Sequence, residues 1–452
     1  MIALILLIIG IFLYLRGRYY FSLMIFLFFV SSGFQIVPSS ILLIGLPGAI
    51  KLSDFALLYV IVLSLCYFTT IVEYSKEVNI YRPVLTFLFF LLAEALYSYI
   101  VLDYSLSIII RSARNYLFVF SFFIFLFAPA SALRQVFKTL MIITLLQCIV
   151  YLIQIPLNQS FLTIGLTGGE NFTSTLNGDQ YVRYYNTPIL LNIALFYFIF
   201  IQNYDTLAYK FAILSLIALT VLAPMHRSLM LVNGIVILYG FILLGKIQLK
   251  DLGYLAGVFI IGIIVASNTM VGERMASAID DFKEVQKAST IDKLQTEQNT
   301  FAYRIALFYE RFEYVVRTPE SWLFGLGLLT EDAPQAKKLN FTVGLKNEWD
   351  EITQIDTGDN LWPLLLLRHG ILGTIFYALA FWRIGHYLFK SRLFPLALVG
   401  FLFIAQQFLL SFTNTEMFSH WYYVVAMFFL AIAVLENHTY ENQLALSNSN
   451  LQ

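Results

Sequence analysis

Four arginines in this chain lie where polar segments meet apolar ones, and their chemistry suits an anionic ligand. They are Arg183 in DQYVRYYNTP, Arg227 in PMHRS, and Arg304 and Arg311 in YRIALFYERFEYVVR. A planar guanidinium can donate two parallel hydrogen bonds to a phosphate or carboxylate. Arg304 and Arg311 are seven positions apart and share one face of a helix. Each arginine alone is as well explained by reaching the lipid headgroups or by pairing with a carboxylate such as Glu310, but the four together favour a shared anion.

A second polar cluster, in DTGDNLWPLLLLRHGILGTIFY, comes directly before an apolar run. Asp356, Asp359 and Asn360 could cap the helix that begins there, because Asp and Asn satisfy free N–H groups at a helix start. Asp359, or less readily Asp356, could instead accept a proton in a reaction. Arg368 and His369 follow inside the apolar run, where ionisable residues are either functional or bonded to neighbouring helices.

Several kinds of chemistry find no motif in the sequence. There is no H-E-x-x-H pair, Walker A loop, G-x-S-x-G turn or nucleotide-binding glycine pattern. We therefore predict no metal and no cofactor. The net charge is zero, which argues against a nucleic-acid partner. The two cysteines, Cys66 and Cys148, lie in apolar runs and predict no disulfide framework.

The composition requires lipid as the surrounding solvent. Hydrophobic residues make up 59% of the 452 residues, charged residues make up 12%, and the mean hydropathy is +0.77. Soluble domains are about 45–50% apolar and about 25% charged. Spanning a bilayer takes about 20 apolar residues. Runs near that length lie at 2–15, 19–37, 54–72, 83–101, 113–129, 135–156, 187–203, 207–224, 228–245, 251–269, 360–389, 393–413 and 416–435.

These runs predict an all-α polytopic membrane protein with about 12–13 spans. The first run lacks the features of a cleaved signal peptide, and we interpret it as a retained span. Because it is short, it could instead be a tilted or half-inserted segment, which would place the N-terminus inside and change nothing else. Segment 38–54 is too short and too rich in Gly and Pro to cross the membrane, and we expect it to be re-entrant or interfacial. Polar residues such as Glu94, Gln147, Gln406, Gln407 and Glu416 are expected to form hydrogen bonds between helices.

Basic residues in short turns set the orientation, because such turns face the cytoplasm. Six alternate turns hold Arg16 and Arg18; Lys76 and Arg82; Arg134 and Lys138; Lys210; Lys246 and Lys250; and Arg383, Lys390 and Arg392. The predicted organisation is ten spans in 1–269 with an outer loop at 157–186, a large outer loop at 270–359, three spans in 360–435, and a cytoplasmic tail at 436–452.

The large outer loop is expected to be mainly helical. In FAYRIALFYERFEYVVR, the residues Ile305, Phe308, Phe312 and Val315 recur at helical spacing, which predicts one apolar face. TPESW should end that helix, and the following GLG should allow a tight turn or a close backbone approach.

The ordered segments resemble the O-antigen polymerase (Wzy) and O-antigen ligase superfamily of multi-span glycosyltransferases. YRIALFYERFEYVVRTPESWLFGLGL is similar to the family's Arg-led helix, Pro-containing break and Gly-x-Gly, here Arg304, Pro319, Gly325 and Gly327. DTGDNLWPLLLLRHGILGTIFY is similar to its Asp or Asn before an apolar run with Gly-x-x-Gly. RYYNTPILLNIALF resembles the end of its first outer loop. The Arg-x₁₀-Gly pattern described for both outer loops of some polymerases does not occur at Arg183 or Arg304.

The resemblance implies a GT-C-like architecture and a metal-independent transfer of glycan from an undecaprenyl-pyrophosphate donor to a sugar hydroxyl of a lipid-linked acceptor. It implies that Arg183, Arg227, Arg304, Arg311 and Asn360 bind pyrophosphate or glycan, with Arg183, Arg304 and Asp359 closest to the chemistry. The expected location is the bacterial cytoplasmic membrane, with the site on its outer face, among membrane lipids and beside a chain-length regulator.

A polymerase is favoured over a ligase, because ligases carry a histidine in the large loop and 271–359 contains none. A lipid-linked oligosaccharide flippase is a further alternative, although such transporters show repeats and short loops that this chain lacks.

Overall fold

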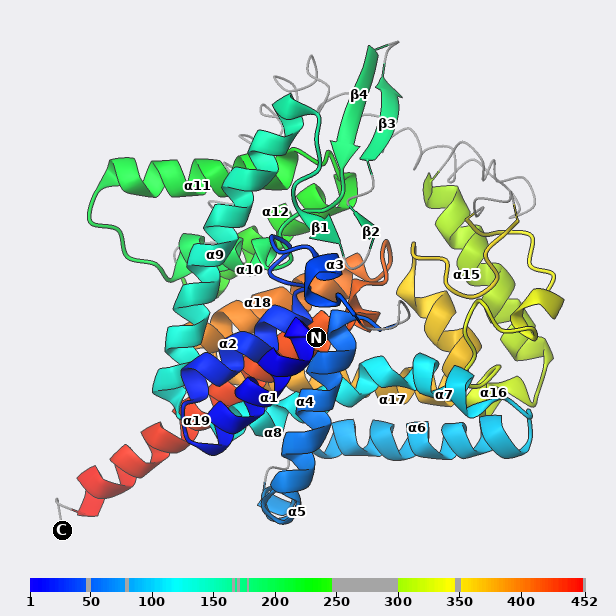
Figure 1. Ribbon diagram of the computed structural model, residues 1–452, viewed down its shortest axis with the longest axis horizontal. Coiled ribbons are helices and arrows are strands. Elements are labelled where there is room, and N and C mark those ends of the chain that lie inside the picture. The colour runs from blue at the N-terminus through cyan, green and yellow to red at the C-terminus, as the bar shows by residue number, and fades with distance from the viewer. Residues whose placement is uncertain are drawn as a thin grey trace.

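The computed structural model describes residues 1–45, 50–77, 81–164, 167–168, 171–176, 179–245, 300–345 and 351–449. Long apolar helices make up most of this part of the chain (Figure 1). In chain order the helices are α1 (Ile2–Leu15), α2 (Tyr19–Val30), α3 (Ser39–Leu42), α4 (Leu52–Cys66), α5 (Phe68–Glu77), α6 (Arg82–Ile100), α7 (Leu106–Ala113), η2 (Arg114–Phe120), α8 (Ser121–Leu126), α9 (Ala130–Leu157), α10 (Leu191–Phe200), α11 (Leu207–Leu222), α12 (Arg227–Leu243), α15 (Thr300–Arg317), α16 (Ser321–Phe324), η5 (Ala336–Lys338), α17 (Leu361–Lys390), α18 (Pro395–Leu410), η6 (Glu416–Phe418) and α19 (His420–Ser449).

Every described apolar run of the sequence contains a helix. Five segments are long and apolar enough to cross a membrane: α6, Leu106–Leu126, α9, α17 and the first part of α19. The bent pair α4 and α5, with an angle of 80° between them, would make a sixth. Six further apolar helices have 10–17 residues. A helical protein with several membrane spans is therefore confirmed, whereas the count of 12–13 stays a prediction, and run 251–269 lies outside the described residues.

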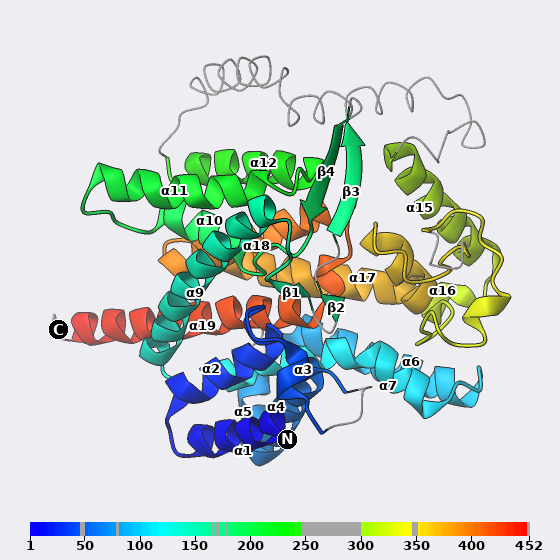
Figure 2. The same cartoon turned by 45° about the horizontal axis from the view of Figure 1, so that its top comes forward.

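Two small hairpins interrupt the helical pattern within 157–186. Strand β1 (Thr163–Ile164) pairs with β2 (Thr167–Gly168), and β3 (Asn171–Leu176) pairs with β4 (Asp179–Tyr184), both antiparallel. The long hairpin projects from the helices in Figure 2. Gln35, at the end of α2, holds the chain on both sides of this segment, because its backbone carbonyl accepts from Thr163 N at 2.9 Å and its side chain accepts from Ile189 N at 2.9 Å.

Helix α17 is broken at Gly370, which corrects the prediction of one uninterrupted helix over 360–389. Gly370 has φ 64° and ψ −168°, values that do not occur inside an α-helix. The break leaves carbonyl groups without intrahelical hydrogen-bond donors. Backbone N–H groups of the GLG turn act as their donors instead. Leu326 N donates to Leu367 O at 2.6 Å, and Gly327 N donates to Arg368 O at 3.1 Å.

Glycine is needed at this junction because the two backbones touch. A Cβ on Gly325 would collide with the carbonyl of Leu367, and a Cβ on Gly370 would lie 2.6 Å from the carbonyl oxygen of Ser321. Both glycines also have positive φ, which disfavours other residues. The close approach predicted for GLG therefore attaches the α15–α16 region to α17 at its break.

The apolar face predicted for α15 is correct at Val315 and wrong at Phe308 and Phe312. Phe308 and Phe312 are exposed and stack on each other with their ring centroids 5.9 Å apart, whereas Leu307 and Val315 are buried. The inward position that the pattern assigned to a phenylalanine belongs to Arg311, which is fully buried. Hydropathy patterns treat arginine as polar, but its long side chain can pack inward where polar partners meet the guanidinium.

Candidate functional site

A cavity of about 440 Å³ lies where α2, α12, α18 and α19 meet the segment that follows β4. Many polar side chains line it. The lining residues include Ser32, Gln35, Thr163, Thr187, Asn192, His226, Gln407, Asn414, Glu416 and His420, together with apolar Val30, Ile189, Leu229, Leu410 and Trp421. Concave sites with a few placed polar groups are the usual form of a small-molecule or glycan site. We take this cavity as the centre of the candidate site.

Arg304 and Asp359 form an ion pair beside the cavity. Their Nη2 and Oδ1 atoms are 3.6 Å apart, and both side chains keep some exposure, 18% and 27%. Arg304 also donates to the carbonyl of Thr413 at 3.4 Å, and the Thr413 hydroxyl donates to Ser228 Oγ at 3.2 Å. Because Asn414, the next residue, lines the cavity, the pair lies at the edge of the cavity.

Asp359 and Arg227 both act on Arg304 at this edge. Burial lowers the pKa of Arg304, the Asp359 carboxylate raises it again, and the positive charge of Arg227 lowers it further. Burial also raises the pKa of Asp359, against the opposing effect of Arg304. Two guanidinium groups therefore influence this edge, and guanidinium groups suit a ligand that brings negative charge.

The polypeptide before α17 is held in place so that Asp359 faces this edge. Glu331 accepts hydrogen bonds from the backbone N–H groups of Gln354, Ile355 and Asp356 at 2.8, 2.7 and 3.1 Å. Leu361 N then donates to Ser411 O at 2.9 Å, which joins the start of α17 to the end of α18.

The helix cap of α17 is Asn360, not an aspartate. Its Oδ1 accepts from Trp362 N at 3.1 Å, and the residue is 5% exposed. Asp356 pairs instead with Arg368, with Nη2 and Oδ1 2.6 Å apart. The sequence left open which residue caps this helix, and the observed cap leaves the Asp359 side chain to Arg304. That Asn360 binds glycan stays a prediction, although its side-chain oxygen already accepts the capping hydrogen bond.

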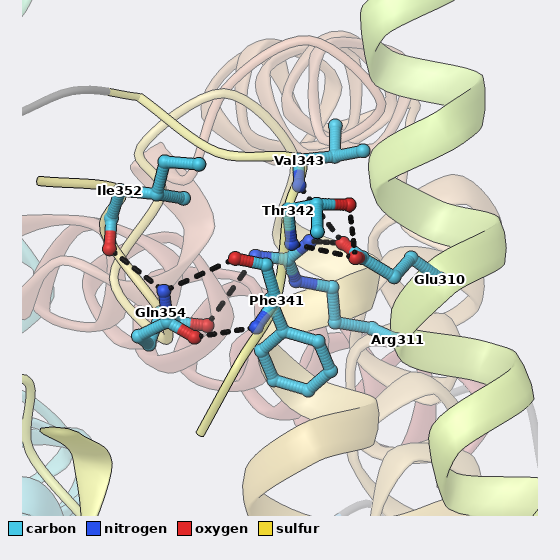
Figure 3. Close-up of polar contacts among 7 residues, drawn as sticks. All are labelled: Glu310, Arg311, Phe341, Thr342, Val343, Ile352 and Gln354. Atoms are coloured by element: carbon cyan, nitrogen blue, oxygen red, sulfur yellow. Dashed lines mark hydrogen bonds and ion pairs between the residues drawn. The ribbon is translucent and has the colours of Figure 1, made fainter. Parts of the chain in front are cut away.

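Arg311 is far less accessible than Arg304. Its side chain is fully buried, pairs with Glu310, and lies over the ring of Phe341 with Cζ 4.4 Å from the centroid (Figure 3). Glu310 in turn accepts from Thr342 N at 2.7 Å and Val343 N at 3.1 Å. Burial lowers the pKa of Arg311 to about 10, and Glu310 opposes that shift. Binding a pyrophosphate through Arg311 would require this cluster to open.

The other two predicted arginines are placed only in part. Arg227 is the first residue of α12, next to His226, which lines the cavity. Arg183 lies in β4 opposite Phe172, and its side chain lies outside the part of the chain that the structure describes. The structure thus brings Arg227, Arg304 and Asp359 to one edge and places Arg311 in the packed interior.

Arg368 and His369 belong to a closed polar cluster between helices. His369 Nδ1 is 2.7 Å from Glu94 Oε2, and its Nε2 is 2.5 Å from the Tyr116 hydroxyl. Arg368 donates from Nε to the carbonyl of Leu329 at 3.0 Å. The side chains of His369 and Glu94 are fully buried. Bonding to neighbouring helices, the alternative that the sequence left open for His369, is what the structure shows.

Sequence reasoning missed the cavity. Glu416 was expected to form an interhelical hydrogen bond, and its side chain does bond to Trp421 of α19, but the residue also lines the cavity. The histidines at 226 and 420 also line it, although they are distant in sequence. No local pattern links these residues, because four separate segments bring them together. Among the described residues there is no group of three or more His, Cys, Asp or Glu that could hold a metal ion.

Comparison with known proteins does not assign a family to the chain: no family model matches it, and no curated protein is similar to it.

Proposed function

We propose that this chain is a membrane glycosyltransferase of the polymerase type, which transfers a glycan from an undecaprenyl-pyrophosphate donor to a sugar hydroxyl of a lipid-linked acceptor. The single observation that supports this proposal most is the pair Arg304–Asp359 at the edge of a cavity lined by both polar and apolar side chains, with Arg227 close enough to influence it. In this proposal the site faces the outer side of a bacterial cytoplasmic membrane.

The chemistry fits these groups. The donor already carries a pyrophosphate leaving group, so the protein must mainly align donor and acceptor and stabilise the charge that develops on the departing pyrophosphate. Guanidinium groups can do this, because their hydrogen bonds strengthen as negative charge builds up. The polar lining of the cavity supplies amide and hydroxyl groups that can bind sugar hydroxyls.

A ligase, which would transfer finished polymer to lipid A-core, is the second candidate. Segment 271–359 contains no histidine, which favours the polymerase. However, His226 and His420 reach the cavity from other segments, so a histidine is available near the site. A flippase of lipid-linked oligosaccharide has less support, because the cavity lies beside an arginine–aspartate pair that transport alone does not require.

Deletion of the gene, followed by gel analysis of the cell-surface glycan, tests the proposal. A polymerase mutant should carry single repeat units on lipid A-core and regain the full ladder on complementation. Accumulation of polymer on undecaprenyl pyrophosphate would indicate the ligase instead. Absence of both single units and polymer would indicate the flippase.

The proposed sidedness has its own test. In a Cys66→Ser background, which removes the exposed native thiol, we expect a cysteine at Lys337 to react with a membrane-impermeant reagent in spheroplasts. A cysteine at Leu393, which is 91% exposed in the turn before α18, should react only after the membrane is permeabilised. Labelling in the opposite order would place the site on the cytoplasmic side.

A further inference from the structure

Glu416 begins the short helix η6, whose position is fixed by contacts with neighbouring helices. The next residue, Met417, is buried, and its carbonyl accepts from the Tyr377 hydroxyl at 2.8 Å. The carbonyl of Phe418 accepts from Asn115 Nδ2 at 3.2 Å, and its ring lies under Arg368 with Cζ 5.0 Å from the centroid. Contacts from α17 and η2 therefore hold η6, while Glu416 at its start lines the cavity.

The Glu416 segment also touches the segment that carries Asp359. The Thr415 hydroxyl donates to the carbonyl of Gly358 at 3.4 Å, and each of these residues is adjacent in sequence to one of the two acids. Glu416 thus lies next to the edge where Arg304 and Arg227 act, but on the cavity side of it.

The two carboxylates differ in their partners. Asp359 pairs with Arg304, so the positive guanidinium partly neutralises its carboxylate. Glu416 makes no ion pair with any described residue, and its side-chain partner is Trp421, whose hydrogen bond lowers the pKa. Burial by the surrounding protein has the larger effect and raises the pKa of Glu416. Burial raises the pKa of both carboxyl groups, so the difference lies in their partners, and the carboxylate without a cation partner is the better proton acceptor.

We propose that Glu416 is the general base that takes the proton from the acceptor hydroxyl in the cavity. This inference rests on the proposed glycosyltransferase function. The acceptor oxygen forms a bond to the anomeric carbon of the donor, and the bond from that carbon to the pyrophosphate oxygen breaks. The electron pair of the broken bond leaves with the pyrophosphate, and the hydroxyl proton passes to Glu416 and then to solvent. In this arrangement Arg304 and Arg227 stabilise the leaving group, and Asp359 positions Arg304.

The same step predicts a pH dependence. Glu416 must be ionised to accept the proton, so kcat should rise with pH through the raised pKa of this residue. The other titratable groups around the site are His226 and His420 in the cavity lining, and Arg227, Arg304 and Asp359 at its edge. His420 donates Nε2–H to the carbonyl of Val30 at 3.0 Å, which holds its ring in place.

The test uses purified full-length protein in lipid nanodiscs, with lipid-linked repeat units extracted from cells that lack this chain. We compare Glu416→Gln, Glu416→Asp, His226→Gln and Asp359→Asn with the wild type, and use Glu313→Gln as the matched control. Glu313 pairs with Arg317 on α15 and does not line the cavity.

We expect Glu416→Gln to lower kcat at least about 100-fold, with KM changed by less than about threefold, and to lose the rise of kcat with pH. Glu416→Asp should restore part of kcat, and added formate should restore part of it in Glu416→Gln. The control should match the wild type. A structural role alone would lower the amount of folded protein without changing the pH profile of what remains.

Three results would overturn the proposal, and they are distinguishable. If the wild type polymerises the extracted substrate and Glu416→Gln does so at the same rate and with the same pH profile, Glu416 is not the base, and the proposed function stands. Loss of the pH limb in His226→Gln or Asp359→Asn alone would assign the base to that residue instead. If the wild type itself makes no polymer, the function and the base assignment both fall.

Discussion

The first part of α17 has an arginine–aspartate pair at each end. The two pairs differ in the distance between their charged atoms and in how deeply the arginine is buried. At the break, Arg368 is 3% exposed, and its Nη2 lies 2.6 Å from Oδ1 of Asp356, whose side chain is 42% exposed. At the N-terminus, Arg304 and Asp359 are 3.6 Å apart and partly exposed, with Arg227 acting on the same arginine. The Arg368–Asp356 pair lies at the break in α17, where the GLG turn is attached to the helix. The looser pair, with a second guanidinium group acting on it and a cavity beside it, can take a ligand.

The same contrast appears within α15. Arg311 is buried among Glu310, Phe341 and Gln354, whereas Arg304, two turns earlier, reaches the cavity edge. Equal spacing on one helix face did not mean equal exposure, because the two ends of α15 pack against different surroundings. If this difference is correct, substitutions at the buried Arg311 and at the junction of the GLG turn with α17 should affect folding. Substitutions at Arg304 should affect activity.

The largest effect should come from the junction itself. Gly325→Ala adds a Cβ that collides with Leu367 O and forces a positive φ on alanine, so we expect a loss of about 3–5 kcal/mol in the free energy of unfolding. The matched control is Gly358→Ala, where φ is +70° but no atom lies within 4 Å of the new Cβ. The control should lose only about 1–2 kcal/mol. Thermal unfolding in detergent measures both, and equal losses would mean that the contact with α17 is not limiting.

A smaller loss of stability is expected at the closed arginine. Arg311→Ala removes the contacts with Phe341 and Gln354, which we expect to cost about 2–3 kcal/mol. Arg304→Ala should cost less than half as much. Limited proteolysis of the large loop, at matched protein concentration, reports the difference. Faster cleavage in Arg304→Ala than in Arg311→Ala would reverse the assignment of the two arginines.

Activity should respond to the open arginine in the opposite way. Arg304→Lys keeps the positive charge but cannot form two parallel hydrogen bonds, so we expect the polymer yield to fall about 10- to 100-fold. The amount of protein in the membrane should stay normal. Arg317→Lys is the control, because Arg317 pairs with Glu313 on the surface of α15. A wild-type ladder from Arg304→Lys would mean that Arg304 acts only as a positive charge at the membrane surface.

Adjacent residues at the start of α17 should separate capping from function. Asn360→Ala removes the observed cap and should cost about 1 kcal/mol of stability. Asp359→Asn should cost well under that and still lower polymer yield, because Arg304 loses its charged partner. If Asp359→Asn unfolds more easily than Asn360→Ala, the cap has been assigned to the wrong residue.

The smallest effect is expected at a surface pair that also joins the loop to the helices. Arg111 in α7 pairs with Asp332, and both side chains are about half exposed, at 45% and 60%. Exposed pairs contribute about 0–1 kcal/mol, so Arg111→Ala should shift the unfolding midpoint only slightly, and less at high salt. A loss similar to that of Gly325→Ala would show that this pair, rather than the backbone junction, holds the loop.

Local patterns in the sequence predicted the local parts of the structure. The apolar runs located the helices, GLG indicated a close backbone approach, and the polar cluster before Leu361 indicated a cap. What the patterns could not supply depends on partners distant in the chain. Arg311 faces inward because residues near 341 and 354 meet its guanidinium, and hydropathy periodicity carries no information about them.

The cavity was unpredictable for the same reason. Its lining combines the end of α2, the segment after β4, the start of α12 and the turn between α18 and α19. The break in α17 was also missed, because Gly370 occurs in an apolar run that satisfies every criterion for a continuous span.

The junction between the GLG turn and α17 has a consequence for biosynthesis. The carbonyls that receive Leu326 and Gly327 belong to residues about forty positions later in the chain, so they do not yet exist when the ribosome has completed α15 and α16. Until α17 has been translated and inserted, the amides of the turn must bond to water or to a chaperone. A nascent chain that stalls before Arg368 would therefore present a loop with no fixed attachment, which makes this interval the stage of synthesis most open to proteases and quality control.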